Sequence, residues 1–163
     1  MRAHRFLAAV TSIAGAALAQ TTSEDVGLTL GGPSINTPIG QICGPVPCQP
    51  LPGGGITRGA TYYLTQNAAA FSPYAMAIGT PTSTCMQIPG IANGLLLGTP
   101  TTIFAAGVTG PPVPVFLCPR GVDTVQFVIP TSVPAGIGFH LQSVGVSWSG
   151  ELAFSPAIAA VTQ

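Results

Sequence analysis

The most regular alternation of hydrophobic and polar residues lies in residues 122–146. In its first half, Val125, Phe127 and Ile129 alternate with mainly polar neighbours. A period of two puts alternate side chains on opposite faces of a β-strand. We therefore predict that these three side chains face a core and that the residues between them face solvent.

The second half of this stretch repeats the pattern after a turn that contains Pro130 and Pro134. The residues predicted to face the core are Ile137, Phe139 and Leu141, and those predicted to face outward are Gly138, His140 and Gln142. Together the two halves predict a β-hairpin.

Shorter segments of the same kind occur elsewhere, separated by turns rich in glycine and proline. They predict strands at residues 26–30, 60–66, 74–78, 84–88, 113–117 and 151–162. Pro156 interrupts the last of these strands, which indicates an edge position or a bulge. Because short strands with frequent turns are typical of two packed sheets, we predict an all-β fold, an antiparallel two-sheet β-sandwich of about eight short strands.

The N-terminus has the composition of a secretory signal peptide over residues 1–19. Arg2 and Arg5 precede an apolar run, and Ala17 and Ala19 supply small residues before a cleavage site. A membrane anchor is the alternative, but the run is shorter than the roughly 20 residues that span a bilayer. We expect a secreted or extracellular protein without a transmembrane segment in its mature chain, and the periplasm and the cell surface are the alternative destinations.

Residues 20–55 contain the possible strand 26–30 and are otherwise dense in proline and glycine. Proline lacks an N–H donor and glycine loses much entropy in a strand, so such a segment is unfavourable in a central sheet. We predict an N-terminal strand and a Pro/Gly-rich arm at residues 20–55, followed by the β-sandwich domain at residues 56–163.

The charge of the chain is low, and it contains no lysine. After removal of residues 1–19, two arginines oppose four carboxylates, which gives a formal charge of −2. This balance excludes a surface that neutralises phosphates, and with it nucleic-acid binding.

Four cysteines in an exported chain indicate disulfides, with three possible pairings. We favour Cys43 with Cys48 and Cys85 with Cys118, and the crossed pairings remain alternatives. A structural zinc is a further alternative, but the paired C-x2-C spacing is absent and His140 is the only histidine after residue 19. We therefore predict no metal and no cofactor.

Catalytic residues are scarce in this sequence. A hydrolase would have to use His140 with Asp123 or Glu151. However, His140 is predicted to be an ordinary exposed strand residue, and Asp123 is predicted to form an ion pair with Arg120. No Gly-x-Ser-x-Gly elbow or phosphate-binding loop occurs. We predict no catalytic residues and no enzymatic activity.

Aromatic residues offer a possible binding surface. Trp148, Tyr62, Tyr63 and Tyr74 could form a platform for a sugar or a partner protein, as in a carbohydrate-binding module. The alternative is that these side chains fill the core of the sandwich.

Several short motifs in the later two thirds of the chain suggest a relationship. They are Asn67-Ala68-Ala69, Gly79 followed by Cys85, Ile129-Pro130, Gly138-Phe139 with Leu141-Gln142, and Phe154-Ser155-Pro156-Ala157-Ile158. Residues 59–161 thereby resemble a small β-rich domain of secreted planctomycete-type bacterial proteins, a largely uncharacterised group. In that group a Gly-x-x-Phe/Tyr-x-x-Gln strand precedes a closing Leu-Ser-Asn-Ala-Leu strand, and here Pro156 stands where asparagine is usual. The resemblance implies an extracellular all-β domain and no particular activity.

The sequence therefore favours an exported structural or adhesive β-sandwich protein without catalysis, and a carbohydrate-binding module or a hydrolase as alternatives. Without lysine, the protection of open sheet edges falls mainly to prolines, namely Pro114, Pro130, Pro134 and Pro156. The low charge also gives little repulsion between copies. We predict self-association or docking to a cell-surface or extracellular matrix partner, and a glycan is the partner under the carbohydrate-binding alternative.

Overall fold

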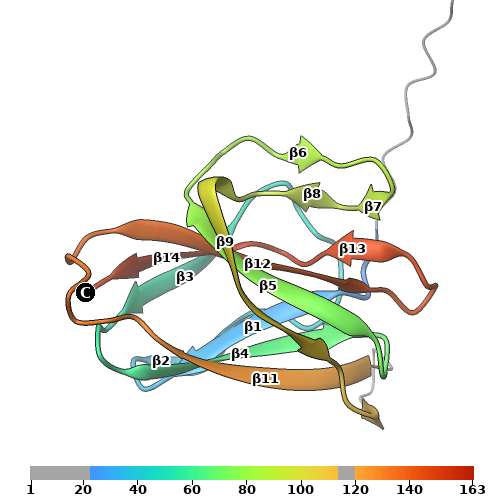
Figure 1. Cartoon of the computed structure of the whole chain (residues 1–163), viewed down its shortest axis with the longest axis horizontal. Helices are drawn as coiled ribbons and strands as arrows, with labels where there is room; N and C mark the ends of the chain where they lie inside the picture. Colours follow the sequence, from blue (N-terminus) through green and yellow to red (C-terminus); the bar gives the residue numbers. More distant parts are fainter. Residues whose placement is uncertain (1–22, 114–119) are drawn as a thin grey trace, which may run out of the picture.

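The computed structural model describes residues 23–113 and 120–163, which form β-strands and their connections (Figure 1). The predicted signal peptide, Pro114 and Cys118 lie outside these residues. Within the described part of the chain, no helix is long and apolar enough to cross a membrane.

The first sheet, sheet A, has five strands in the order β10-β11-β4-β1-β2, and every neighbouring pair is antiparallel. Its strands are β1 (Gly27–Gly32), β2 (Ile35–Gln41), β4 (Thr61–Ala68), β10 (Pro112–Val113) and β11 (Arg120–Val128). Leu64 of β4 lies opposite Leu30 of β1 and Val125 of β11, so three neighbouring strands place apolar side chains on the same face.

The second sheet, sheet B, has seven strands and is centred on β12. Its strands are β3 (Leu51–Ile56), β5 (Pro73–Thr80), β7 (Ile91–Ala92), β9 (Gly98–Val108), β12 (Gly138–Val146), β13 (Leu152–Phe154) and β14 (Ile158–Thr162). One edge of β12 pairs with β5, and the other pairs first with β14 and then with β13. A two-stranded sheet of β6 (Met86–Gln87) and β8 (Gly94–Leu95) lies beside sheet B (Figure 1).

The core lies between sheets A and B, and the predicted all-β sandwich is confirmed. Its largest fully buried side chains include Leu28, Leu30, Tyr62, Leu64, Met76, Leu141 and Ile158. Val125 and Phe127 pack against this core from β11, and Phe139 belongs to it from β12. The alternation in residues 122–146 therefore predicted the inward faces of both strands correctly. The sandwich was predicted to be antiparallel, but two strand pairs of sheet B, β13 with β7 and β14 with β3, are parallel.

The predicted hairpin is wrong, because β11 and β12 lie in different sheets. β11 bonds to β4 and β10 in sheet A, whereas β12 bonds to β5, β13 and β14 in sheet B. The connection through Pro130 and Pro134 therefore carries the chain from one layer of the sandwich to the other. Ile137, predicted to face the core, is exposed at the end of this connection.

The predicted arm is also corrected, because residues 27–56 contribute β1, β2 and β3. β1 is an inner strand, but the Pro- and Gly-rich β2 and β3 are edge strands of sheets A and B. An edge strand needs hydrogen-bond donors on one side only, so it tolerates proline. Glycine has a further use at Gly53, where a Cβ would lie 2.5 Å from the carbonyl oxygen of Ala159.

The last predicted strand is two strands, and neither matches the predicted edge position. β13 and β14 both pair with β12, and β14 lies between β12 and β3. Pro156 is buried in the break between them. The break arises because proline cannot donate to β12, and Ser155 keeps the contact through its N–H, which donates to the Ser143 carbonyl at 2.9 Å.

Both favoured disulfide pairings are wrong, because Cys48 bonds to Cys85. Nearness in sequence favoured the pair Cys43 and Cys48, but the fold instead brings the loop before β3 and the loop before β6 together. The Cα atoms of Cys48 and Cys85 lie 5.5 Å apart across a separation of 37 residues. Cys43 is not a free thiol either.

Candidate functional site

Residues 91–97, here called the covering segment, begin with β7 at the edge of sheet B and continue through β8 over the outer face of β12. Gln142 of β12 holds this segment through its side-chain amide. Its Oε1 accepts a hydrogen bond from Leu96 N–H at 2.8 Å, and its Nε2 donates to the carbonyls of Gly94 and Ser155, each at 2.8 Å. One buried side chain thus joins the covering segment to both β12 and the β13–β14 connection.

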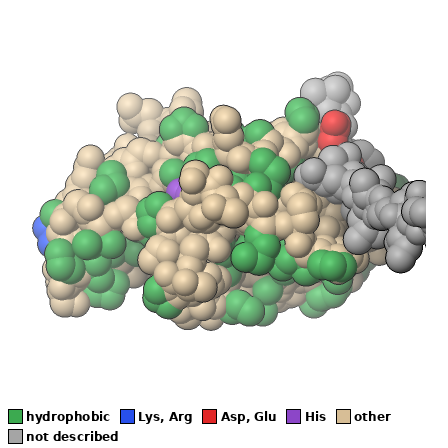
Figure 2. All heavy atoms as spheres, turned by 90° about the horizontal axis from the view of Figure 1, so that it is seen from above, with side chains coloured by type: hydrophobic (Ala, Val, Ile, Leu, Met, Phe, Trp, Pro, Cys, Tyr) green, Lys and Arg blue, Asp and Glu red, His purple; other side chains and the backbone are tan. Residues whose placement is uncertain are grey.

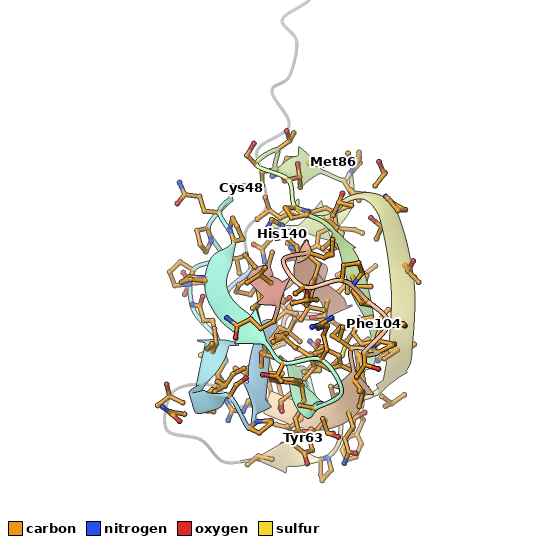
Figure 3. The ribbon with its side chains drawn as sticks, turned by 90° about the vertical axis from the view of Figure 1, so that its left-hand side faces the viewer. Cys48, Tyr63, Met86, Phe104 and His140 are labelled. Atoms are coloured by element: carbon orange, nitrogen blue, oxygen red, sulfur yellow. A yellow bond between two sulfur atoms is a disulfide. The ribbon has the colours of Figure 1, made fainter. Side chains whose placement is uncertain are left out.

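Three further features fix the same segment. His140 Nδ1 lies 2.8 Å from the Leu96 carbonyl oxygen (Figure 3). Asn93 Nδ2 donates to the carbonyls of Ser23 and Phe154, at 2.9 and 2.7 Å. The Cys48–Cys85 disulfide packs against Gly94, where any Cβ would collide with a cysteine sulfur.

The prediction that His140 and Gln142 face solvent is therefore wrong. Their side chains are 4% and 1% exposed. Both lie on the outer face of β12, as the alternation indicated, but the covering segment buries that face. Leu96 belongs to no strand, so its backbone N–H and C=O groups need other partners, and Gln142 and His140 of β12 supply them.

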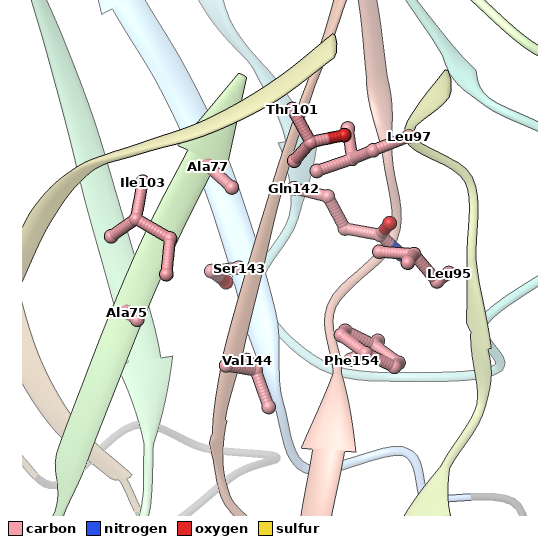
Figure 4. A pocket seen from close by; sticks show the side chains of 10 residues that line it. All are labelled: Ala75, Ala77, Leu95, Leu97, Thr101, Ile103, Gln142, Ser143, Val144 and Phe154. Carbon is pink, nitrogen blue, oxygen red and sulfur yellow. The ribbon is translucent and has the colours of Figure 1, made fainter. Parts of the chain in front are cut away.

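A pocket of about 170 Å³ opens between the covering segment and β9; we call it the outer pocket (Figure 4). Its lining residues are Ala75, Ala77, Leu95, Leu97, Thr101, Ile103, Gln142, Ser143, Val144 and Phe154. Ala77 lies opposite Gln142, and Ala75 opposite Val144, so paired residues of β5 and β12 form the floor. The small alanine side chains leave the space that the pocket occupies.

Two polar side chains around the outer pocket, those of Gln142 and Thr101, already have partners, whereas Ser143 Oγ is buried without a hydrogen-bond partner in the described structure. Gln142 uses its oxygen and its nitrogen as described above, and Thr101 Oγ1 donates to the Gly98 carbonyl at 2.9 Å. No charged residue contributes to the lining. The pocket can therefore accept an apolar group, and the one unpartnered side-chain atom among its described lining residues, Ser143 Oγ, is buried.

The four aromatic residues predicted to form a platform are not brought together. Tyr62 and Tyr74 are core residues, 0% and 5% exposed. Tyr63 points away from the core on the outer side of sheet A (Figure 3), and Trp148 is exposed in the turn between β12 and β13. Two of the four rings are thus unavailable to a sugar.

Tyr74 has a different role, because its hydroxyl donates to Asp123 Oδ2 at 2.6 Å. This bond links β5 of sheet B to β11 of sheet A. Burial, together with the neighbouring Asp123 carboxylate, raises the pKa of Tyr74 well above its usual value.

The residues considered for a hydrolase do not converge. Asp123 lies in β11 of sheet A, whereas His140 lies on the outer face of sheet B. Glu151 is exposed and follows the turn at the far end of β12. Asp123 is bonded to Tyr74 rather than to Arg120, whose Nε and Nη1 are buried without a partner among the described residues. In residues 23–113 and 120–163, no cluster of three His, Cys, Asp or Glu side chains is suited to a metal ion.

The second surface feature is β9, which among the described strands pairs with β5 alone and so forms one edge of sheet B. It is 11 residues long and contains no charged residue. Ile103 and Val108 are 68% and 58% exposed, and Phe104 turns toward Phe127 of β11 with ring centres 6.1 Å apart. Figure 2 shows that acidic and basic side chains are rare on the face above sheet B.

No protein-family model matches the chain, and no curated protein is similar to it in sequence. The resemblance to a secreted planctomycete-type domain therefore stays a prediction, and the site must be interpreted from its own geometry.

Sequence reasoning missed the outer pocket and its covering segment. A signal was present in residues 74–78. Ala75 and Ala77 alternate there with Tyr74 and Met76, so the two alanines lie on one face of the strand and the two larger residues on the other. Small apolar residues on the strand face opposite the core are consistent with a second layer over the strand, because solvent-facing strand positions usually carry polar side chains.

Proposed function

We propose that the protein is an exported, non-catalytic structural or adhesive β-sandwich whose copies associate through the free edge of β9. The observation that carries this proposal is the long, uncharged and partly apolar edge of that strand. An exposed strand edge presents unpaired N–H and C=O groups, which are a template for another strand.

The composition of β9 favours a second copy of the same strand as the partner. Natural edge strands are commonly protected by lysine, and β9 contains none. Two identical β9 strands can pair antiparallel about a two-fold axis, and no like charges then come to lie opposite each other. Pro100 and a bulge near Phe104 interrupt the strand, so we assign the pairing to Ala105–Val108.

Export is supported by the predicted signal peptide and by the Cys48–Cys85 disulfide. The disulfide is compatible with an extracellular location, because such bonds persist in oxidising compartments. An assembling role at the cell surface or in an extracellular matrix fits these features.

The two alternatives have less support. A hydrolase would need His140 beside a carboxylate, but His140 is buried and its Nδ1 is occupied by the Leu96 carbonyl. A carbohydrate-binding platform would have to rely on Trp148 and Tyr63, which lie on different elements.

The proposal is tested by measuring the mass of the exported protein in solution, using light scattering across micromolar concentrations. We expect the wild type to exceed the monomer mass. Ala106→Lys should reduce it to the monomer, because the lysines of two paired strands would repel each other. Ala135→Lys is the matched control, since Ala135 is also exposed but lies in the β11–β12 connection.

Two results would contradict this proposal. The wild type could remain monomeric at every concentration, or Ala106→Lys and Ala135→Lys could reduce association equally. The second result would assign association to charge alone rather than to the edge of β9.

A further inference from the structure

We propose that the outer pocket is a binding site for a small uncharged molecule whose inserted part is a single six-membered ring or an alkyl group of similar size. Thr101 and Ile103 of β9 line the pocket, but Ala105–Val108, to which the proposed pairing is assigned, do not, so this site does not depend on the proposed association.

The size of the pocket sets the first limit on the ligand. Its volume is about 170 Å³. An apolar protein cavity of roughly 150 Å³ lined by Leu, Ile and Phe stays dry and binds benzene, so a pocket of this size accommodates one ring. A single ring is therefore the size that we assign to the inserted group.

The chemistry of the lining sets the second limit. Leu95, Leu97, Ile103, Val144 and Phe154 supply the walls, and no charged side chain is among the lining residues. A sugar, a carboxylate or an amine would lose its hydration without gaining a hydrogen bond, which costs several kcal/mol for a charged group. An apolar ring loses no such interactions.

The pocket is also held open by the fold before any ligand arrives. Its floor consists of β5 and β12, two paired inner strands of sheet B. Its wall, the covering segment, is fixed by the side chains of Gln142 and His140. A preformed pocket needs little ordering on binding, and that favours affinity for a small ligand.

A small molecule fits this site better than a partner protein. Of the lining residues, Ile103 is the one large hydrophobic side chain that is strongly exposed in the described structure. Stable protein interfaces bury on the order of 1,000 Å² or more, with a central apolar cluster. Apart from Thr101 and Ile103, the lining residues are buried or half-buried, so the pocket itself offers little of the area that such an interface needs.

The test is a titration of the exported protein with benzene, followed by the methyl signals in two-dimensional NMR. We expect saturable shifts at the methyls of Ala75, Ala77 and Val144. Benzoate, benzylamine and glucose should give none at the same concentrations. A capped phenylalanine dipeptide tests the alternative that the site holds a protein side chain, and tighter binding of this peptide than of benzene would overturn the proposal.

Variants locate the binding. Ala77→Leu fills the pocket and should weaken benzene binding by about tenfold or more, and Ala135→Leu is the matched control on an exposed loop. Ala75→Leu repeats the test if Ala77→Leu misfolds. Ile103→Ala widens the pocket and should shift the preference from benzene toward naphthalene.

The proposal is overturned if folded wild type shows no saturable shift with benzene, or if Ala77→Leu and Ala75→Leu fold and bind benzene as well as the wild type. Repeating the titration on Ala106→Lys separates the two proposals. Benzene should bind this variant whether or not the β9 edge associates, so failure of one proposal does not decide the other.

Discussion

Gln142 is the side chain whose removal should do most damage to the outer face of sheet B. It is 1% exposed and makes three hydrogen bonds, to Leu96 N–H and to the carbonyls of Gly94 and Ser155. Gln142→Leu keeps most of the side-chain volume and removes all three bonds. This substitution therefore isolates the contribution of the hydrogen bonds of one side chain to the free energy of unfolding.

The size of the effect follows from the groups left behind. A buried polar group without a partner costs about 1–3 kcal/mol, and the two carbonyls lie toward the low end because each oxygen has a second lone pair. We expect the free energy of unfolding to fall by about 3–5 kcal/mol. That is a large part of the roughly 5–15 kcal/mol that stabilises a typical domain.

Urea denaturation followed by far-ultraviolet circular dichroism measures this loss. The matched control is Gln126→Leu, the same substitution at an exposed position of β11, which should change the stability by less than about 0.5 kcal/mol. Hydrogen exchange adds a local measurement, because the Leu96 amide should exchange much faster in Gln142→Leu.

One result would refute this reasoning. If Gln142→Leu lost less than about 1 kcal/mol and the Leu96 amide stayed protected, the hydrogen bonds of Gln142 would carry little weight. Packing and the Cys48–Cys85 disulfide would then be what holds the covering segment.

Three further outcomes follow from the structure. Tyr74→Phe should lower stability by about 1.5–3 kcal/mol, because Asp123 loses a hydrogen bond to its carboxylate. The pKa of Tyr74 is raised by burial and by Asp123, so its contribution is present below about pH 10, the pKa of a free tyrosine, and is lost as the pH rises above it. Denaturation curves should therefore show wild type losing more stability than Tyr74→Phe above that pH. Replacing Cys48 and Cys85 together by serine should cost about 4 kcal/mol for a closed loop of 37 residues, measured by thermal melting, and non-reducing peptide mapping should recover the Cys48–Cys85 pair. Leu30→Ala should lower stability by about 2–5 kcal/mol in urea denaturation, because Leu30 is fully buried between the sheets.

The sequence was sufficient to predict strands with one buried face. β4 and β11 belong to this class, and in β11 the half-buried Val125 and Phe127 alternate with exposed neighbours. In such strands the contrast between core and solvent appears directly in the residue types. The inward register could therefore be predicted, whereas the sheet to which each strand belongs could not, because backbone pairing carries no residue code.

Edge strands of the sheets, and contacts between residues far apart in the sequence, were less predictable. β2 and β3 contain Pro38 and Pro52, and proline is unfavourable in a strand unless that strand has a free side. The free side is a property of the assembled sheet rather than of the local sequence. The same holds for Cys48 and Cys85, whose approach depends on where β3 and β6 lie in the fold.

The outer face of β12 shows why the candidate site itself was not predicted. His140 and Gln142 alternate with core residues in the way that exposed side chains do, yet both are buried beneath the covering segment. Their polar groups form hydrogen bonds with the backbone of that segment. The two side chains that the alternation placed toward solvent are therefore those that hold the wall of the outer pocket. Loss of Gln142 should consequently weaken benzene binding although every apolar lining side chain remains, because the wall itself loosens. If the strands alone formed the pocket, affinity for benzene and protection of the Leu96 amide would change independently of each other.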